Sequence, residues 1–182
     1  TKFTKYTAYP QVEITSRTWP NKTITSNPIW CPVDLRDGNQ ALAEPMDAER
    51  KMKFFKKLIE IGFKEIEVGF PSASEIDFNF IRELILDGHI PSDVTIQVLT
   101  QSRKELINKT IQSLEGCENA IIHLYNSTST LQRKVVFKED MAGVKKIATD
   151  GAKIILDNIH RLTNSNIRFE YSPESFTGTE LE

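Results

Sequence analysis

The chain has 182 residues, 39% of them apolar and 26% charged, with a formal net charge of −2 and a pI near 6.0. This length fits one domain with a sizeable core, and the scattered Lys and Arg residues exclude the basic footprint of a nucleic-acid-binding protein. No apolar run approaches the roughly 18 residues that span a bilayer, and no leader pattern or CxxC pair is present. We therefore expect a cytoplasmic chain with reduced cysteines and no membrane partner.

Residues 1–28 are rich in Thr, Pro and Asn and have weak periodicity, so we expect an amino-terminal arm there. The apolar run Ile29–Leu35 predicts the first strand of the main domain, although Pro32 would remove one donor from its ladder. Arg36 and Asp37 follow at once, before a turn at Gly38. They would lie at the carboxyl end of that strand, where βα proteins hold reactive side chains.

The chemistry of this turn suits a site. Arg36 carries a planar fork of donors that matches a carboxylate or a developing alkoxide. Asp37 supplies a hard oxygen ligand of the kind that Mg²⁺ and Mn²⁺ prefer. A motif this short is more often an ordinary surface ion pair, so its weight depends on the residues at the other strand ends.

The spacing of apolar residues predicts a helix from Asp47, a suitable N-cap, to Ile61, ended by Gly62. Its buried stripe would comprise Met52, Phe55, Leu58 and Ile59. Its solvated face would carry Lys51, Lys53, Lys56 and Lys57.

Four more strands are predicted, at residues 65–70, 94–100, 120–125 and 167–171. The helix after the first of them would bury Phe78, Ile81, Leu84 and Ile85. Ser102 and Glu105 predict a capping box for the next helix, which would bury Leu106, Ile107, Thr110, Ile111 and Leu114. A polar loop at 126–133 would lead to a long helix over residues 141–159.

This alternation predicts a parallel sheet with right-handed crossovers. The pattern is shared by doubly wound sheets and by (β/α)8 TIM barrels, but no GxGxxG or GxxxxGK[ST] follows any strand. A full barrel takes about 250 residues. We therefore expect an incomplete TIM barrel, with about the first five βα units in residues 29–182.

Polar residues recur at the predicted strand ends, and they are Arg36, Asp37, Gln40, Glu67, Thr100, Gln101, His123, Tyr125, Asn126, Glu170, Ser172 and Glu174. Alternation along a strand puts His123 and Tyr125 on one face, and likewise Ser172 and Glu174. Because charged groups inside a barrel are costly unless they are paired or bind a metal, their number favours a site. Taken singly, His123 fits a hydrogen-bonded core residue equally well.

Three segments, Val33–Leu42, Lys64–Ser74 and Phe169–Glu182, closely resemble the long-chain class of 2-isopropylmalate synthases. Gln97–Gln101 and His123–Ser129 resemble it too, and the likeness extends from Arg17 onward. Homocitrate and citramalate synthases share the Arg-Asp-Gly turn but are less similar elsewhere.

The resemblance implies an acyltransferase of the DRE-type TIM-barrel family. Such enzymes condense acetyl-CoA with 2-oxoisovalerate to 2-isopropylmalate and CoA, the first committed step of leucine biosynthesis. It implies Asp37 as a ligand of a divalent metal (Mg²⁺ first, with Mn²⁺ or Zn²⁺ as alternatives) and Arg36 as the group that stabilises the alkoxide. The substrate pocket would be lined by Arg36, Gln40, His123, Ser172 and Glu174, with Glu174 a candidate base. Members of this class are usually homodimers.

The chain also departs from that class. No two of its three histidines lie within four residues, so the metal-binding His-x-His pair has no counterpart. The chain also has no counterpart of the Gly-rich loop for acetyl-CoA, of the later strands or of the regulatory domain. We therefore expect an amino-terminal part of the barrel that is inactive alone. The alternatives are a homocitrate or citramalate synthase, and a non-catalytic fragment whose sheet edge pairs with another chain.

Overall fold

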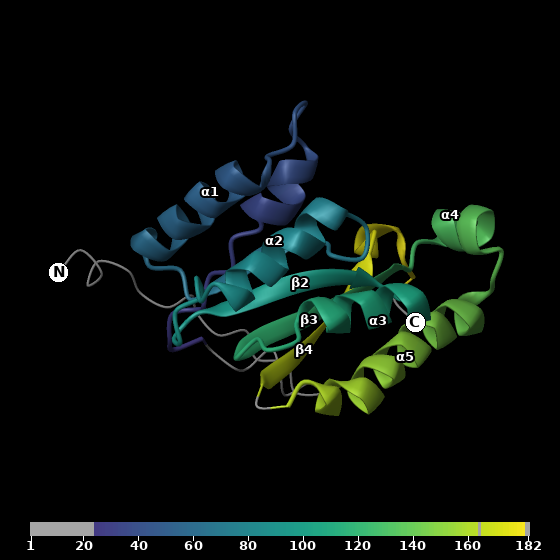
Figure 1. Ribbon diagram of the computed structural model, residues 1–182. Coiled ribbons are helices and arrows are strands. Elements are labelled where there is room, and N and C mark those ends of the chain that lie inside the picture. Colours follow the sequence, from purple (N-terminus) through teal and green to yellow (C-terminus); the bar gives the residue numbers. More distant parts are fainter. Residues whose placement is uncertain (1–23, 164, 181–182) are drawn as a thin grey trace.

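The computed structural model describes residues 24–163 and 165–180, in which strands and helices alternate (Figure 1). The strands are β1 (Glu65–Gly69), β2 (Thr95–Gln101), β3 (Asn119–Ser127) and β4 (Asn166–Glu174). The α-helices are α1 (Ala48–Ile61), α2 (Glu75–Leu86), α3 (Lys104–Ser113), α4 (Thr130–Gln132) and α5 (Met141–Asn158). Shorter helical turns are η3 (Asp34–Gly38), η4 (Arg133–Phe137), η5 (Ile159–Arg161) and η6 (Phe176–Gly178). None of the helices in these residues is long and apolar enough to cross a membrane.

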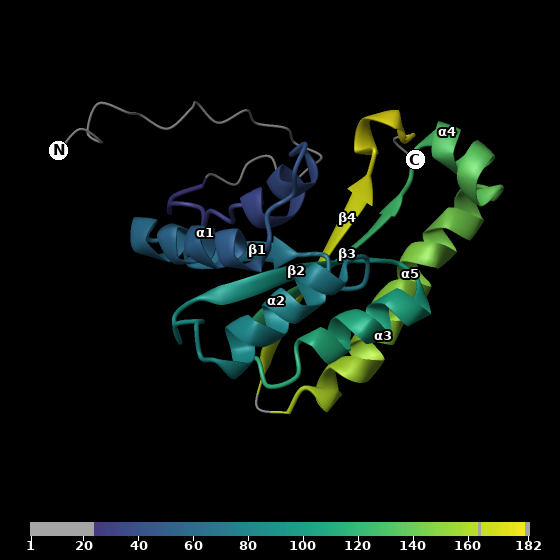
Figure 2. The same ribbon diagram turned by 45° about the horizontal axis from the view of Figure 1, so that its top comes forward.

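The four strands form one parallel sheet in the order β1-β2-β3-β4, as expected for consecutive βα units. Figures 1 and 2 show α1, α2, α3 and α5 ranged along one side of this sheet. On the opposite side, Arg168 of β4 forms an ion pair with Glu65 of β1. A pair between the two outermost strands requires the sheet to curve, as in a barrel. The fold is an incomplete TIM barrel, as predicted, with four strands in the described residues.

The predicted strand over Ile29–Leu35 is wrong. The chain touches β1 there through a backbone bond, in which the Glu67 N–H donates to the Pro32 carbonyl at 3.0 Å. It then enters the π-helical turn η3, where the Val33 carbonyl accepts the N–H groups of Arg36, Asp37 and Gly38 at 3.1, 2.8 and 3.2 Å. Proline has no N–H for a ladder. Arg36 and Asp37 therefore lie in a helical turn instead of at a strand end.

The long helices match their predictions, whereas some side-chain assignments do not. The Asp47 side chain caps α1, and Gly62 ends that helix with φ 110°. Lys51, predicted on the solvated face, is fully buried against Asp77. In α2 the fully buried aromatic ring is Phe80 instead of Phe78.

Two local predictions around α3 and α4 are also wrong. The capping box at Ser102 and Glu105 does not form, because α3 has Arg103 at its N-cap and the Ser102 hydroxyl donates instead to the Ile147 carbonyl of α5 at 2.6 Å. The predicted loop over 126–133 contains the end of β3, the short helix α4 and the start of η4. Of the predicted arm over 1–28, residues 1–23 lie outside the described residues, and 24–28 have no regular structure.

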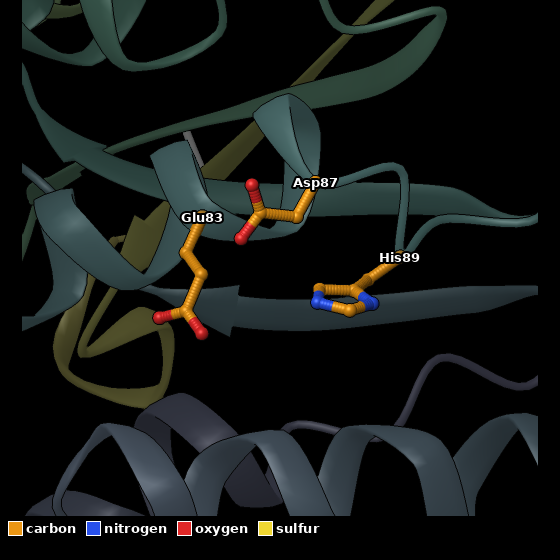
Figure 3. A group of neighbouring side chains, drawn as sticks. All are labelled: Glu83, Asp87 and His89. Atoms are coloured by element: carbon orange, nitrogen blue, oxygen red, sulfur yellow. The ribbon is translucent and has the colours of Figure 1, made fainter.

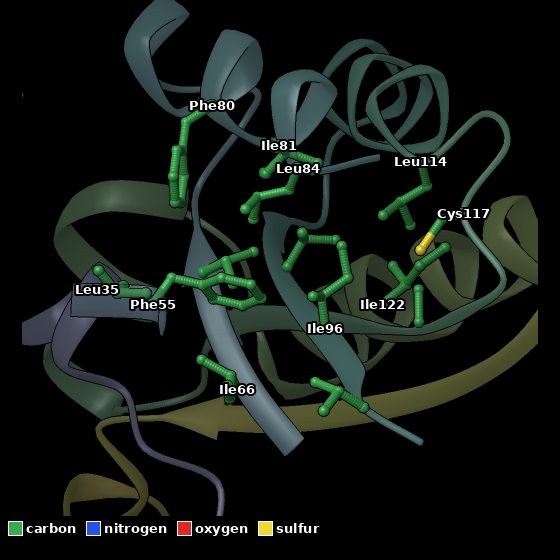
Figure 4. Packing of buried hydrophobic residues seen from close by; sticks show 14 of the residues in the cluster. Leu35, Phe55, Ile66, Phe80, Ile81, Leu84, Ile96, Leu114, Cys117 and Ile122 are labelled. Atoms are coloured by element: carbon green, nitrogen blue, oxygen red, sulfur yellow. The ribbon is translucent and has the colours of Figure 1, made fainter. Parts of the chain in front are cut away.

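The core lies between the sheet and the helices (Figure 4). Alternate residues of β1, β2 and β3, such as Ile66, Ile96 and Ile122, point into it and are fully buried. Phe55 of α1 and Phe80 of α2 meet them from the helical layer. The residues between these strand positions point to the concave side, which is therefore available for polar groups.

Two glycines of α5 test how closely this helix packs. A Cβ at Gly151 would lie 3.1 Å from the Ser102 Cβ and 3.2 Å from the Leu124 Cδ2. We expect Gly151→Ala to lower the free energy of unfolding by about 1–3 kcal/mol through overpacking. Gly143→Ala is the matched control, because its methyl would meet only the side chain of exposed Glu139 and would gain helix propensity of up to about 1 kcal/mol. Urea unfolding measures both, and equal effects of the two substitutions would contradict the packing argument.

Candidate active site

A cavity of about 350 Å³ lies on the concave side of the sheet, between η3 and the carboxyl ends of the strands. Its lining consists of Arg36, Asp37, Gln40, Phe70, Leu99, His123, Tyr125, Ser172 and Glu174. All six residues that the sequence proposes for a site are among these nine. Three of the six, His123, Ser172 and Glu174, come from β3 and β4. Strand alternation places them on the same face of the sheet, where the register pairs His123 with Glu170 and Tyr125 with Ser172.

Beneath the cavity, the carboxylate of Glu67 is completely buried and makes three polar contacts. The Arg36 Nε donates to its Oε1. The Gln97 Nε2 donates to its Oε2 at 2.6 Å, and the His123 Nδ1 lies 2.8 Å from the same oxygen. One carboxylate thus connects η3, β1, β2 and β3.

These partners keep Glu67 ionised. Burial alone would raise the pKa of this carboxyl, because a low-dielectric environment disfavours its charge. The hydrogen bonds from His123 and Gln97 and the positive charge of Arg36 outweigh burial, and the pKa lies below its usual value. The carboxylate of Glu67 therefore carries a negative charge beneath the cavity at neutral pH.

The same contacts orient His123. With its proton on Nδ1, the ring donates to Glu67, and Nε2 is left to accept from the Ser172 hydroxyl at 2.7 Å. This tautomer is assigned from the hydrogen-bond network, since a carboxylate can only accept. The Glu170 Oε1 lies 3.5 Å from the same Nε2, so a protonated ring would also find a partner there.

Arg36 is held at two of its three nitrogens. Besides Nε on Glu67, Nη1 donates to the Asp37 Oδ1 at 2.9 Å. Within the described residues Nη2 makes no hydrogen bond, and the side chain lines the cavity. Arg36 therefore has a fixed orientation and a donor left for a ligand. The Asp37 side chain is 65% exposed, so it is accessible from the cavity.

Gln97 was not among the polar residues noted from the sequence, and Glu67 was noted at the end of its strand but given no role. Both lie at concave-face positions of strands whose neighbouring residues are apolar, as in Ile96-Gln97-Val98. A polar residue at every second position of an otherwise buried strand is the signal that identifies them.

Cys31 lies at the edge of this network, with its Sγ 3.9 Å from the Gln97 Oε1. Burial, assisted by the charge of Glu67, raises the pKa of this thiol to about 12. The sulfur is therefore protonated near neutral pH and is not a nucleophile.

Around Asp37 the described residues do not bring three ligand atoms of His, Cys, Asp or Glu side chains close enough together to hold a metal ion. A different trio, Glu83, Asp87 and His89, has its ligand atoms within 4.8 Å of one another (Figure 3). It is exposed at the carboxyl end of α2, which leads into the start of β2 and hence lies at the opposite end of the sheet from Arg36. Across residues 24–163 and 165–180 no other such trio occurs, so Asp37 can provide part of a metal site but not a complete one.

Comparison with known proteins gives one consistent family. The model of the HMGL-like family matches residues 27–182. Curated 2-isopropylmalate synthases are similar over 98% of the chain: 60% identity for that of Rhodospirillum rubrum, 58% for Kocuria rhizophila and 56% for Pseudomonas putida. The chain spans about a third of the length of these relatives, 31–32%.

The burial of Glu67 generates a prediction with a control on the same strand. Glu67→Gln should lower the free energy of unfolding by about 3–5 kcal/mol at pH 7, because it breaks a buried charge network at one partner. Glu65→Gln, which breaks the pair between a 15% exposed carboxylate and the half-exposed Arg168, should cost less, about 1 kcal/mol.

The effect of Glu67→Gln should depend on pH. The folded-state pKa of Glu67 is below its usual 4.5, so its stabilisation is fully present above about pH 4.5. It is lost as the pH falls through the lower folded-state value. Urea unfolding of both proteins between pH 7 and 3 checks this, and a constant difference over that range would contradict it.

Proposed function

This chain belongs to the HMGL-like family, and we propose that it forms part of the catalytic barrel of a 2-isopropylmalate synthase, with residues 29–182 as the barrel segment and 1–28 as an arm. The reaction would be the condensation of acetyl-CoA with 2-oxoisovalerate to 2-isopropylmalate and CoA. The observation that carries the proposal is Arg36, whose Nη2 makes no hydrogen bond within the described residues and whose side chain lines a cavity together with Asp37, His123, Ser172 and Glu174.

Arg36 would stabilise the oxygen of the 2-oxo group as it becomes an alkoxide. Its guanidinium is immobilised by Glu67 and Asp37, so little reorganisation is needed when negative charge develops. A preorganised donor of this kind contributes typically about 3–4 kcal/mol to lowering the barrier.

Polar and apolar groups divide the cavity between them. Gln40, His123 and Ser172 would bind the polar end of the 2-oxo acid, and the hydroxyl of Ser172 is already oriented by His123. Phe70, Leu99 and Tyr125 form an apolar wall suited to the isopropyl group. That wall favours 2-oxoisovalerate over 2-oxoglutarate, the substrate of a homocitrate synthase, since a buried second carboxylate would have no partner there.

Asp37 would be one ligand of a divalent metal, with Mg²⁺ the first candidate for an oxygen ligand and Mn²⁺ or Zn²⁺ as alternatives. When bound, such an ion would polarise the 2-oxo group as a Lewis acid. Since no complete set of metal ligands surrounds Asp37 among the described residues, the remaining ligands would come from elsewhere in the working enzyme.

Glu174 would accept a proton from the methyl group of acetyl-CoA. It lines the cavity at the end of β4 with its carboxylate unpaired among the described residues. A carboxylate is ordinarily a weak base for a carbon acid, so binding of both substrates must first exclude water around it.

A cytoplasmic location and a homodimer complete the proposal. Neither Cys31 nor Cys117 forms a disulfide, which fits a reducing compartment. Burial is the main cause that raises the pKa of both thiols. The homodimer rests on resemblance alone, and sedimentation velocity of an active enzyme tests it.

A chimera tests the function directly. The chain would replace the matching segment of the Rhodospirillum rubrum relative, which is 60% identical over 179 residues. We expect release of CoA from acetyl-CoA that depends on 2-oxoisovalerate, measured by thiol titration. The isolated 182-residue chain should release none. A folded chimera that uses only pyruvate would identify a citramalate-type enzyme, and activity of the isolated chain would contradict the proposed incomplete site.

Two substitutions in that chimera separate the proposed roles. Arg36→Ala should lower kcat by about 10²–10³-fold, because the alkoxide loses its donor. Asp37→Asn should instead raise the concentration of Mg²⁺ needed for half-maximal activity, since it removes a charged ligand. Steady-state kinetics at varied Mg²⁺ measures both. An Arg36→Ala enzyme with unchanged kcat would exclude the alkoxide role.

A further inference from the structure

A buried ion pair lies behind the cavity, between α1 and α2. Lys51 is completely buried, and its Nζ donates to the Oδ1 of Asp77, which is 8% exposed. The ammonium also lies 5.6 Å from the centre of the Phe80 ring, in the position of a cation–π contact. Neither charge lines the cavity.

The second oxygen of Asp77 reaches the turn that follows β1. The Phe70 N–H donates to the Asp77 Oδ2 at 2.7 Å. The contact is close, because a Cβ at the preceding Gly69 would lie 2.9 Å from the same oxygen. Only glycine at this position lets the carboxylate approach the backbone so closely.

Phe70 is the residue through which this contact reaches the cavity. Its ring lines the cavity and meets the ring of Tyr125 edge to face, with centroids 6.0 Å apart and planes at 77°. Since the backbone of Phe70 is tied to Asp77, the position of the ring depends on a carboxylate that itself touches no ligand.

We propose that Asp77, held by Lys51, is a positioning residue that fixes the Phe70 ring as the apolar wall of the cavity and so limits the size of the hydrocarbon side chain that a bound 2-oxo acid can carry. The size limit rests on the proposed function; the positioning of the ring does not.

The physical argument concerns why two charges are buried here. A buried ion pair adds little net stability, because desolvation of both ions offsets most of their attraction. A neutral side chain in place of Asp77 would pack as well, but without an acceptor it would leave the Phe70 N–H unpaired. Lys51 neutralises the charge of the carboxylate, whose Oδ2 accepts from that N–H.

The first test measures positioning on the full 182-residue chain by NMR. In Asp77→Ala we expect the hydrogen-exchange protection of the Phe70 amide to fall by about tenfold or more and the contact between the Phe70 and Tyr125 rings to disappear from NOE spectra. The double variant Lys51→Met with Asp77→Asn keeps an acceptor for the amide without burying a charge, so it should retain both signals. Glu83→Gln, on the exposed side of α2, is the control and should change neither.

The second test measures size selectivity with the same variants in the chimera and with Mg²⁺ present. Dissociation constants are obtained by isothermal titration calorimetry for pyruvate, 2-oxobutyrate, 2-oxoisovalerate and 4-methyl-2-oxopentanoate. We expect Asp77→Ala to lower the preference for 2-oxoisovalerate over 4-methyl-2-oxopentanoate by about tenfold, because one methylene in a shaped pocket usually has an effect of this size. The double variant should stay within about twofold of the unmodified chimera.

The outcomes are distinguishable. Unchanged protection and an unchanged ring contact in Asp77→Ala would overturn the positioning role. Loss of those signals with equally weakened binding of all four acids would overturn the size limit and leave a purely structural role. If Asp77→Ala fails to fold, the double variant decides, because loss of the Phe70 signals there would contradict the proposal. No binding of any acid to the unmodified chimera would count against the proposed function and the size limit, whereas the exchange and NOE data on the 182-residue chain would still decide positioning.

Discussion

The carboxylate of Glu67 is fully enclosed by protein, and an ionised group in such a place is stable only if donors surround it. Its donors come from a turn and two strands that are distant in sequence: Arg36, Gln97 and His123. Each of them is oriented by satisfying Glu67. The arrangement of the cavity is therefore a consequence of neutralising one buried charge.

The fold was most predictable where its determinants are local. The start and end of α1 depend on Asp47 and Gly62, which act within one turn of the helix. The strand proposed at Ile29–Leu35 was wrong because apolar composition says nothing of hydrogen-bond partners, and only one backbone bond joins this segment to β1. Lys51 was placed on the surface because periodicity cannot anticipate Asp77, 26 residues further on.

The members of the candidate site were also predictable only in part. Arg36 and Asp37 stand out only together with the polar residues at the other strand ends, since an Arg-Asp-Gly turn alone is more often a surface ion pair. The layer beneath them was missed, since the role of Gln97 exists only once β1, β2 and β3 lie side by side. The buried contacts of Asp77 are a second case, because no local pattern links that carboxylate to the turn after β1.

The ion pair between Glu65 and Arg168 joins residues 103 positions apart, on the first and last strands of the sheet. It can form only after β2 and β3 have paired between them, so it belongs to the last contacts made during folding. Interactions absent from the folding transition state act on the unfolding rate. Any stability that this pair contributes therefore slows the first opening of the curved sheet and lengthens the lifetime of the folded chain.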